Sequence, residues 1–279
     1  MINKGLCYGN SFFYPIINNL CKEGRVTEAQ DMFGFIISTS QRPDVIMFSL
    51  LMDGYCLVGK MDEAMRILDY MLSIGLEPDI VLYNILLNGY CKTGRIDDGS
   101  RLFREMSLQG VEPTNITYSI ILDGLFQAGR IIAAKEKFHE MTENGIPVDI
   151  EIYNTVLRGL CKNNCTNEAI TLFQKLGPMK VKFDIITINI MISAMFKARN
   201  IEKARDLFAS ISDNGLVPSV VTYSIMMTNF IKEGLLAEAD DIFTSMEKTG
   251  CAPDSKMLNN KGKIIRAGNY LSKIDKKNL

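Results

Sequence analysis

A sequence motif of about 20 residues recurs along this chain at intervals that are multiples of 35 residues. The stretch LEPDIVLYNILLNGYCKTGR begins at residue 76, VEPTNITYSIILDGLFQAGR begins at residue 111, and LVPSVVTYSIMMTNFIKEGL begins at residue 216. The third start lies three further intervals of 35 residues beyond the second. A repeat of roughly 20–50 residues is typical of a solenoid, in which each unit buries its apolar face only against its neighbours. This spacing therefore argues against a fold built around one central core.

The Pro-Asp link, or its counterpart, marks the end of each unit and divides most of the chain into seven repeats, numbered here 1 to 7. Their bounds are 10–44, 45–79, 80–114, 115–149, 150–184, 185–219 and 220–254. In this register, residues 1–9 are interpreted as the end of a truncated repeat, as in a fragment or a truncated gene product. Residues 255–279 are interpreted as a shortened degenerate repeat and a C-terminal cap.

Two helices are predicted in each repeat. The first is marked in repeat 3 by apolar residues at i, i+3, i+4 and i+7, which are Tyr83, Leu86, Leu87 and Tyr90. The second is marked in repeat 2 by an apolar stripe of Met61, Ala64, Met65, Leu68, Met71 and Leu72. Gly94 is expected to end the first helix, and Gly75 with Pro78 the second, because glycine suits a helix C-terminus and proline cannot continue a helix. The predicted fold class is all-α, a solenoid of helix-turn-helix repeats.

Composition excludes several kinds of protein. A chain with 47% hydrophobic and 23% charged residues is able to bury a core and is not a disordered tail. No apolar run approaches the roughly 20 residues that span a bilayer, so no membrane partner is expected. The net charge of −1 gives no overall attraction for a nucleic acid, so such a partner would need a local row of Lys or Arg.

Neither a cofactor nor a catalytic centre is indicated. Four of the seven cysteines recur at multiples of 35 residues, namely Cys21, Cys56, Cys91 and Cys161. A recurring position favours a small buried residue over a disulfide or a zinc ligand. The single histidine, His139, is followed by Glu140, but the C-x-x-C of a zinc deaminase is missing from the sequence. We therefore expect no metal, no cofactor, no small-molecule substrate and no enzymatic activity.

The strings TYSIILDGLFQAGR and GLEPDIVLYN resemble the pentatricopeptide repeat. The tetratricopeptide repeat, with a period of about 34 residues, carries a Trp-containing pattern, whereas this chain has no Trp. The resemblance covers residues 1–254 and continues weakly to the end, and the uniform repeat length is similar to the P class of the family. The strings GYC and GKMDEA and the tail RAGNYLSKIDKKNL further resemble the C-terminal part of plant fertility-restorer proteins.

The resemblance implies a right-handed superhelix that binds single-stranded RNA, with one base read by each repeat. It also implies that the fifth and the last residue of a repeat read the base. In repeats 2 to 7 these pairs are Ser49 with Asp79, Asn84 with Thr114, Ser119 with Asp149, Asn154 with Asp184, Asn189 with Ser219, and Ser224 with Asp254. The family's pairing rules give 5′-G-Y-G-U-C-G-3′, where Y is a pyrimidine assigned to the less regular second pair. Tyr14 leaves the preference of repeat 1 unreadable, and Asn259 is not expected to act as a reader.

An alternative stays open for the last residue of each repeat, because Asp, Ser and Thr also cap the N-terminus of a helix. The fifth residue lies inside the first helix, where Asn and Ser gain nothing from their polarity. Their amide and hydroxyl groups are suited to hydrogen bonds with the Watson–Crick edge of a base. The fifth position therefore favours base readout more strongly than the last position does.

Two further positions are candidates for RNA contact. The resemblance implies that the second residue flanks the base, and in repeats 2 to 7 it is Ile46, Val81, Ile116, Glu151, Ile186 and Val221. Packing at the start of the helix is the alternative, and the carboxylate of Glu151 would disfavour a base and nearby phosphates. The thirteenth residue is lysine in five repeats, namely Lys22, Lys92, Lys162, Lys197 and Lys232. These lysines are predicted to contact phosphates, or alternatively to stabilise the C-terminus of a helix.

The sequence thus predicts a non-catalytic, sequence-specific binder of single-stranded RNA. A scaffold that binds another protein through the same face is the alternative. The likeness to fertility restorers implies action in the mitochondrion on the processing, stability or translation of an organellar transcript, with protein processing factors as further partners.

Overall fold

The computed structural model describes residues 9–39, 42–177, 181–262 and 264–265. The predicted truncated repeat at the N-terminus and most of the predicted C-terminal cap therefore lie outside the described residues. The described chain divides into two units, one ending at Ile152 and the other beginning at Tyr153. The division falls within a single helix, and each unit is described by itself below.

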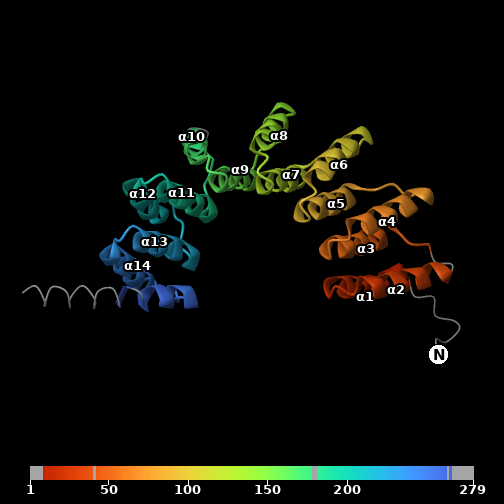
Figure 1. Ribbon diagram of the computed structural model, residues 1–279, viewed down its shortest axis with the longest axis horizontal. Coiled ribbons are helices and arrows are strands. Elements are labelled where there is room, and N and C mark those ends of the chain that lie inside the picture. The colour runs from red at the N-terminus through yellow and green to blue at the C-terminus, as the bar shows by residue number, and fades with distance from the viewer. Residues whose placement is uncertain (1–8, 40–41, 178–180, 263, 266–279) are drawn as a thin grey trace, which may run out of the picture. The chain divides into compact units, whose positions relative to one another are not determined.

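Helices follow one another as hairpins in both units (Figure 1). In the first unit they are α1 (Asn10–Lys22), α2 (Val26–Ser38), α3 (Val45–Leu57), α4 (Met61–Ser73), α5 (Ile80–Lys92), α6 (Ile96–Leu108), α7 (Asn115–Gln127) and α8 (Ile131–Glu143). Helix α9 (Ile150–Lys162) contains the division. In the second unit they are α10 (Thr166–Leu176), α11 (Ile185–Lys197), α12 (Ile201–Asp213), α13 (Val220–Lys232), α14 (Leu236–Lys248) and a helical stretch over residues 255–262. The described residues contain no strand, and the all-α fold class is confirmed.

The first helix of every repeat begins at the first residue of that repeat, and in repeats 2, 3, 5, 6 and 7 the side chain of the residue before it caps the helix. The Asp44 carboxylate accepts a hydrogen bond from the backbone N–H of Met47 at 3.0 Å, and Asp79 accepts one from Leu82 at 2.9 Å. The turn that follows the first helix needs a left-handed residue, which is Gly94 in repeat 3, with φ +74°. The predicted helix boundaries thus have a local chemical cause.

The predicted apolar stripe of α5 forms the core, since Tyr83, Leu86, Leu87 and Tyr90 are all buried. In α4 the prediction was right for Met61, Ala64, Leu68 and Met71 and wrong for Leu72, which is 48% exposed. Leu72 lies beside Met65, which is half-buried, at one edge of the stripe, and both residues line a pocket together with Leu102 of α6. The buried face of α4 is therefore narrower than the sequence indicates.

Cysteine and glycine allow the first helices of neighbouring repeats to approach closely. A methyl group added to Gly54 would lie 2.3 Å from the Sγ atom of Cys21, and one added to Gly124 would lie 2.3 Å from the Sγ atom of Cys91. Burial raises the pKa of the Cys21 thiol to about 11 and that of the Cys56 thiol to about 12. These thiols are protonated at neutral pH, in keeping with a packing role. None of the described helices combines the length and the apolar character needed to cross a membrane.

Candidate nucleic-acid interface

Aliphatic side chains at the second position of the repeats are exposed at the start of the first helix. They are between 48% and 65% exposed, and they are Ile46, Val81, Ile116, Ile186 and Val221. Burial of apolar surface stabilises a fold, so packing within the repeat does not account for a recurring exposed aliphatic residue. Glu151 is exposed at the same position of repeat 5. The second position is thus available to flank a planar ligand.

The fifth and the last side chains of a repeat lie close enough for a hydrogen bond in two repeats. In repeat 1, the Tyr14 hydroxyl donates to the Asp44 carboxylate. In repeat 5, the Asn154 amide nitrogen lies 3.2 Å from both carboxylate oxygens of Asp184. The chain separates the members of each pair by 30 residues, and the hairpin geometry brings them together. In repeats 1 and 5 the fifth and last positions are therefore in direct contact.

The last-position aspartate Asp44 accepts hydrogen bonds from three residues. One oxygen of Asp44 accepts the N–H of Met47, while the other accepts the amide of Asn10 at 3.0 Å and the hydroxyl of Tyr14. Partial burial opposes ionisation of Asp44, but these hydrogen bonds outweigh it and lower the pKa of the carboxyl group. The bond to Asp44, with burial, raises the pKa of Tyr14 to about 12. Capping and a role in the interface are therefore compatible in the same residue.

The remaining aspartates also cap helices, so the capping alternative holds for each of them. Asp149 accepts the N–H of Ile152 at 2.9 Å, and its second oxygen accepts the amide of Asn115 at 2.9 Å. Asp254 accepts the N–H of Met257 at 2.8 Å. Asn115 is the first residue of repeat 4, as Asn10 is of repeat 1, and neither amide was predicted to take part. An amide at the first position of a repeat, 34 residues before an aspartate, is the signal that identifies both.

Asparagine at the fifth position has a different environment in repeats 3 and 6. The side-chain oxygens of Asn84 and Asn189 are buried, and no hydrogen-bond partner is found for either within the described part of the chain. The last residues of these repeats, Thr114 and Ser219, form capping boxes with a threonine of the next repeat. A buried polar atom without a partner is costly, and a ligand that supplies a donor removes that cost.

Serine occupies the fifth position in the other predicted readers. The Ser49 hydroxyl donates to the backbone oxygen of Val45 at 2.9 Å. Ser49 and Ser119 are half-buried, whereas Ser224 is buried. A serine hydroxyl that donates to the i−4 carbonyl keeps its lone pairs for a donor on a ligand.

The predicted phosphate contacts are all exposed at the ends of the first helices, namely Lys22, Lys92, Lys162, Lys197 and Lys232. The ammonium of Lys197 donates to the backbone oxygen of Cys161, near the end of the preceding α9, at 2.8 Å. This contact supports the alternative of helix stabilisation for that lysine. Sequence reasoning missed Asp53, a half-buried carboxylate close enough to Lys22 and Lys92 for both to favour its ionised form. Asp53 lies one helical turn before Leu57, which replaces the recurring lysine in repeat 2, and this spacing could have identified it from the sequence.

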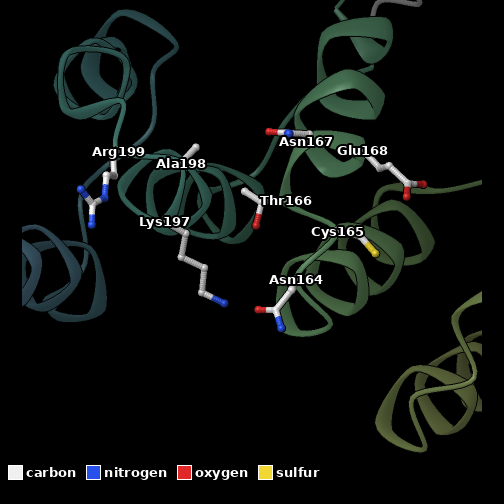
Figure 2. A pocket seen from close by; sticks show the side chains of 8 residues that line it. All are labelled: Asn164, Cys165, Thr166, Asn167, Glu168, Lys197, Ala198 and Arg199. Atoms are coloured by element: carbon white, nitrogen blue, oxygen red, sulfur yellow. The ribbon is translucent and has the colours of Figure 1, made fainter.

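An open pocket of about 850 Å³ lies between the turns that follow α9 and α11 (Figure 2). It brings Lys197 of repeat 6 beside the turn of repeat 5, where Asn164 adopts a left-handed backbone conformation with φ 62°. Among the residues that the structure describes, no group of three or more His, Cys, Asp or Glu side chains is arranged to hold a metal ion. The polar groups on this part of the molecule are thus suited to hydrogen bonding and charge contact.

Solved structures similar to this chain include those of the pentatricopeptide repeat protein PPR10. A crystal structure of maize PPR10 matches 92% of this chain and 39% of its own length, with a TM-score of 0.68 and 20% identity. PPR10 in complex with an 18-nt psaJ RNA element matches the same 92% of this chain with a TM-score of 0.58. PRORP2 from A. thaliana, a nuclear proteinaceous RNase P, matches 66% of this chain and 41% of its own length, with a TM-score of 0.53 and 17% identity. The chain spans about two fifths of the length of these proteins, and such distant likenesses show the fold alone.

Matches to models of protein families identify the family of the chain. The sequence matches the PPR repeat family over residues 78–127, 148–197, 183–232 and 218–256. Further matches to a single PPR repeat cover residues 41–72, 15–38 and 116–146. None of the curated proteins compared with the sequence matches it. Since the matches to the PPR repeat family alone cover more than half of its length, the chain belongs to the pentatricopeptide repeat (PPR) family.

Proposed function

We propose that this chain binds single-stranded RNA sequence-specifically, with one base bound by each repeat, and that it catalyses no reaction. The observation that carries this proposal is the meeting of the fifth and last side chains, seen in the hydrogen bond between Asn154 and Asp184. Two polar side chains from different parts of a repeat meet there, and Ile186, the second residue of the following repeat, is an exposed aliphatic residue. A flat ligand with hydrogen-bonding edges suits such a site, and PPR10, which has the same fold, is described in complex with RNA.

Each repeat supplies two kinds of contact to its base. The second-position aliphatic residue, such as Val81 at 55% exposure, packs on the face of the base. The fifth and last side chains bond its Watson–Crick edge, and the pairing rules of the family give 5′-G-Y-G-U-C-G-3′ for repeats 2 to 7. Glu151 opposes this arrangement in repeat 5, because its carboxylate faces an anionic strand. The base bound by repeat 5 is therefore held mainly by its edge.

The exposed lysines supply the electrostatic part of the proposed affinity. For a single strand, the slope of log K against log[salt] is about −0.7 for each phosphate neutralised, so five contacts give about −3.5. Lys197 already binds a backbone oxygen, and Asp53 offsets Lys22 and Lys92. A slope smaller in magnitude than −3.5 is thus expected.

The decisive experiment measures binding of the purified chain to 5′-GCGUCG-3′ and 5′-GUGUCG-3′ RNA at two salt concentrations. A scrambled RNA and DNA of the same sequence are the controls. The variant Asn189→Ser removes the predicted cytosine reader of repeat 6 and is expected to abolish preference only at the fifth base. Binding that ignores sequence, or no binding, would contradict the proposal and favour the protein-binding scaffold.

In the cell we propose a mitochondrial site of action and a role in the processing, stability or translation of an organellar transcript, including restoration of fertility. The similarity of the 35-residue repeats to the P class and to plant fertility restorers supports this assignment. Binding alone protects RNA from nucleases or keeps it unfolded, so recruited protein factors supply any chemistry. Crosslinking of the tagged protein in isolated mitochondria, followed by sequencing, tests the proposal, and recovery of nuclear or cytosolic transcripts only would overturn it.

A further inference from the structure

We propose that Thr187, the third residue of repeat 6, is a positioning residue that sets the base selectivity of the preceding repeat. It acts through Asn154 and Asp184, the predicted reading pair of repeat 5. This inference rests on the RNA binding proposed above and adds a third residue, supplied by the next repeat, to the pair. Thr187 is not at one of the predicted reading positions, and its side chain is 0% exposed.

The three side chains form one closed hydrogen-bonded cluster. The Thr187 hydroxyl oxygen lies 2.8 Å from Oδ1 of Asn154 and 2.8 Å from Oδ1 of Asp184. The amide nitrogen of Asn154 lies 3.2 Å from both oxygens of Asp184. Asn154 itself is only 3% exposed, so the cluster determines how its amide is oriented.

The orientation of the Asn154 amide follows from the chemistry of its neighbours. An ionised carboxylate only accepts hydrogen bonds, so the amide nitrogen has to face Asp184. The amide oxygen then faces Thr187, whose hydroxyl is able to donate to it. Rotating the amide by half a turn would place its oxygen against the carboxylate and lose the contact with Asp184, whereas the Thr187 hydroxyl is able to accept from the amide nitrogen as well as to donate to the amide oxygen. Asp184 therefore sets the orientation of the amide, and the Thr187 hydroxyl holds the amide in place by a further hydrogen bond.

Threonine occupies the equivalent position after repeats 3 and 6, yet there it makes a different contact. The Thr117 hydroxyl oxygen accepts the backbone N–H of Thr114 at 3.1 Å, and that of Thr222 accepts the backbone N–H of Ser219 at 3.1 Å. Both threonines thus complete a capping box with a hydroxyl residue.

In those two repeats the side-chain oxygen of the fifth residue, Asn84 or Asn189, has no hydrogen-bond partner within the described structure. The last residue of the repeat therefore decides what the following threonine does. Beside aspartate the threonine hydroxyl is shared between the asparagine and the carboxylate, and beside serine or threonine it takes part in the cap.

A locked amide discriminates between pyrimidines better than an amide that is free to turn. Cytosine presents an amino donor where uracil presents a carbonyl acceptor. An amide in one fixed orientation matches one of these patterns, whereas an amide that turns over is able to match either. Repeat 5 is therefore expected to distinguish uracil from cytosine more sharply than repeats 3 and 6 do.

The test compares the full chain with Thr187→Val, Thr187→Ser and Thr222→Val. Each protein is titrated with 5′-GCGUCG-3′ and with RNAs changed only at the fourth base, U to C, or at the fifth base, C to U. Thr187→Val is expected to reduce the preference for U at the fourth base by about fivefold, the effect of one hydrogen bond, with no change at the fifth base. Thr187→Ser retains the hydroxyl and is expected to keep the preference. Thr222→Val removes a hydroxyl that contacts Ser219 and lies in the next repeat, and it is expected to leave the preference at the fourth base unchanged.

Retention of the fourth-base preference in Thr187→Val would overturn the inference while leaving RNA binding intact. Failure of the unsubstituted chain to bind any of these RNAs would overturn the proposed function and the inference with it. A measurement without RNA guards against misfolding of the variant. The side-chain amide protons of Asn154 in the unsubstituted chain are expected to exchange with solvent more slowly than those of Asn84, and equal rates would contradict the locked orientation.

Discussion

The amide nitrogen of Asn154 lies 3.2 Å from the carboxylate of Asp184, a residue that follows it by 30 positions in the chain. The same carboxylate caps α11 by accepting the N–H of Thr187 at 2.7 Å. Hydrogen bonds from Thr187 and Asn154 outweigh the effect of partial burial and lower the pKa of Asp184, so this group is an anion at neutral pH. A residue needed for folding thus also defines the acceptor beside the reading side chain.

Replacing Asp184 with serine separates these two roles. Serine also caps a helix, so Asp184→Ser is expected to fold, and its pair with Asn154 then matches that of Asn189 and Ser219. The preference at the fourth base is expected to change from uracil to cytosine by about tenfold, measured as the ratio of the two dissociation constants. Asp79→Ser, in repeat 2, is the matched control and should leave the fourth base unaffected. An unchanged uracil preference in Asp184→Ser would mean that the last residue does not take part in readout.

The hydrogen bond between Tyr14 and Asp44 predicts a pH-dependent stability. The pKa of Asp44 in the folded chain is lowered from 3.8. The contribution of Asp44 to the free energy of unfolding is therefore present above pH 3.8 and is lost as the pH falls through the folded pKa. The pKa of Tyr14 is raised from 10.0 to about 12. The contribution of Tyr14 to the free energy of unfolding is therefore present below pH 10 and is lost as the pH rises through about 12. Tyr14→Phe should therefore lower the free energy of unfolding of the N-terminal repeats by about 1 kcal/mol at neutral pH.

Urea denaturation of the Tyr14→Phe variant at several pH values measures this effect. The difference from the unsubstituted chain is expected to shrink as the pH falls below 3.8 and through the lower folded pKa of Asp44. Tyr83→Phe is the control for loss of a tyrosine hydroxyl, and its effect is expected to be independent of pH in the acid range. A difference for Tyr14→Phe that is constant from acid to neutral pH would argue that the hydroxyl does not interact with the Asp44 carboxylate.

The helices were predictable because their signals lie close together in the sequence. The stripe of Tyr83 and Leu86, the glycine at residue 94 and the capping Asp79 all act within one or two turns of α5. The positions of the candidate readers were equally visible, since a polar residue such as Asn84 recurs inside an apolar helix. The fixed spacing of 35 residues identifies the residues that occupy the same position in successive repeats.

Contacts between repeats were harder to predict. The acceptor of Lys197, the position of Asp53 between two lysines, and the different partners of Thr187 and Thr222 depend on how neighbouring helices meet. A repeat spacing does not give the distance between two side chains across a helix–helix contact. The exposure of Leu72 has the same origin, because the width of a buried face is set by the neighbour that covers it.

Backbone strain at Arg199 predicts a stabilising substitution. Arg199 occupies the turn position that is glycine in most repeats, and its φ is 55°, in the left-handed region. A side chain there costs about 1 kcal/mol, so Arg199→Gly should raise the free energy of unfolding of the C-terminal unit by about that amount. Asn164→Gly, with φ 62°, should stabilise less because asparagine tolerates this conformation, and Gly234→Ala should destabilise. Destabilisation by Arg199→Gly would show that the arginine side chain makes a contact worth more than the strain.

Close approach of α5 and α7 predicts a coupled pair of residues. A methyl group on Gly124 would lie 2.3 Å from Sγ and 2.9 Å from Cβ of Cys91, so Gly124→Ala should destabilise the chain by about 2 kcal/mol. Removing the sulfur in Cys91→Ala makes room, so the double variant should lose less stability than the sum of the single variants. Gly34→Ala is the control, because Gly34 lies in a helix with nothing within 4 Å of the added methyl group, and it should stabilise slightly. Additive effects of Gly124→Ala and Cys91→Ala would contradict the close contact.

Asp53 predicts a substitution that strengthens RNA binding. Burial raises the pKa of its carboxyl group, while the nearby Lys92 and Lys22 oppose that rise, so the carboxylate offsets two of the predicted phosphate contacts. Asp53→Asn removes one negative charge beside these lysines and should tighten RNA binding by about threefold at low salt. It should also increase the steepness of the salt dependence, since both lysines then interact with phosphate alone. Asp69→Asn, an exposed residue on α4 of the same repeat, makes the same change in net charge and should have no such effect. Equal tightening by Asp53→Asn and Asp69→Asn would indicate that only net charge matters, and that Lys22 and Lys92 do not form a local phosphate site.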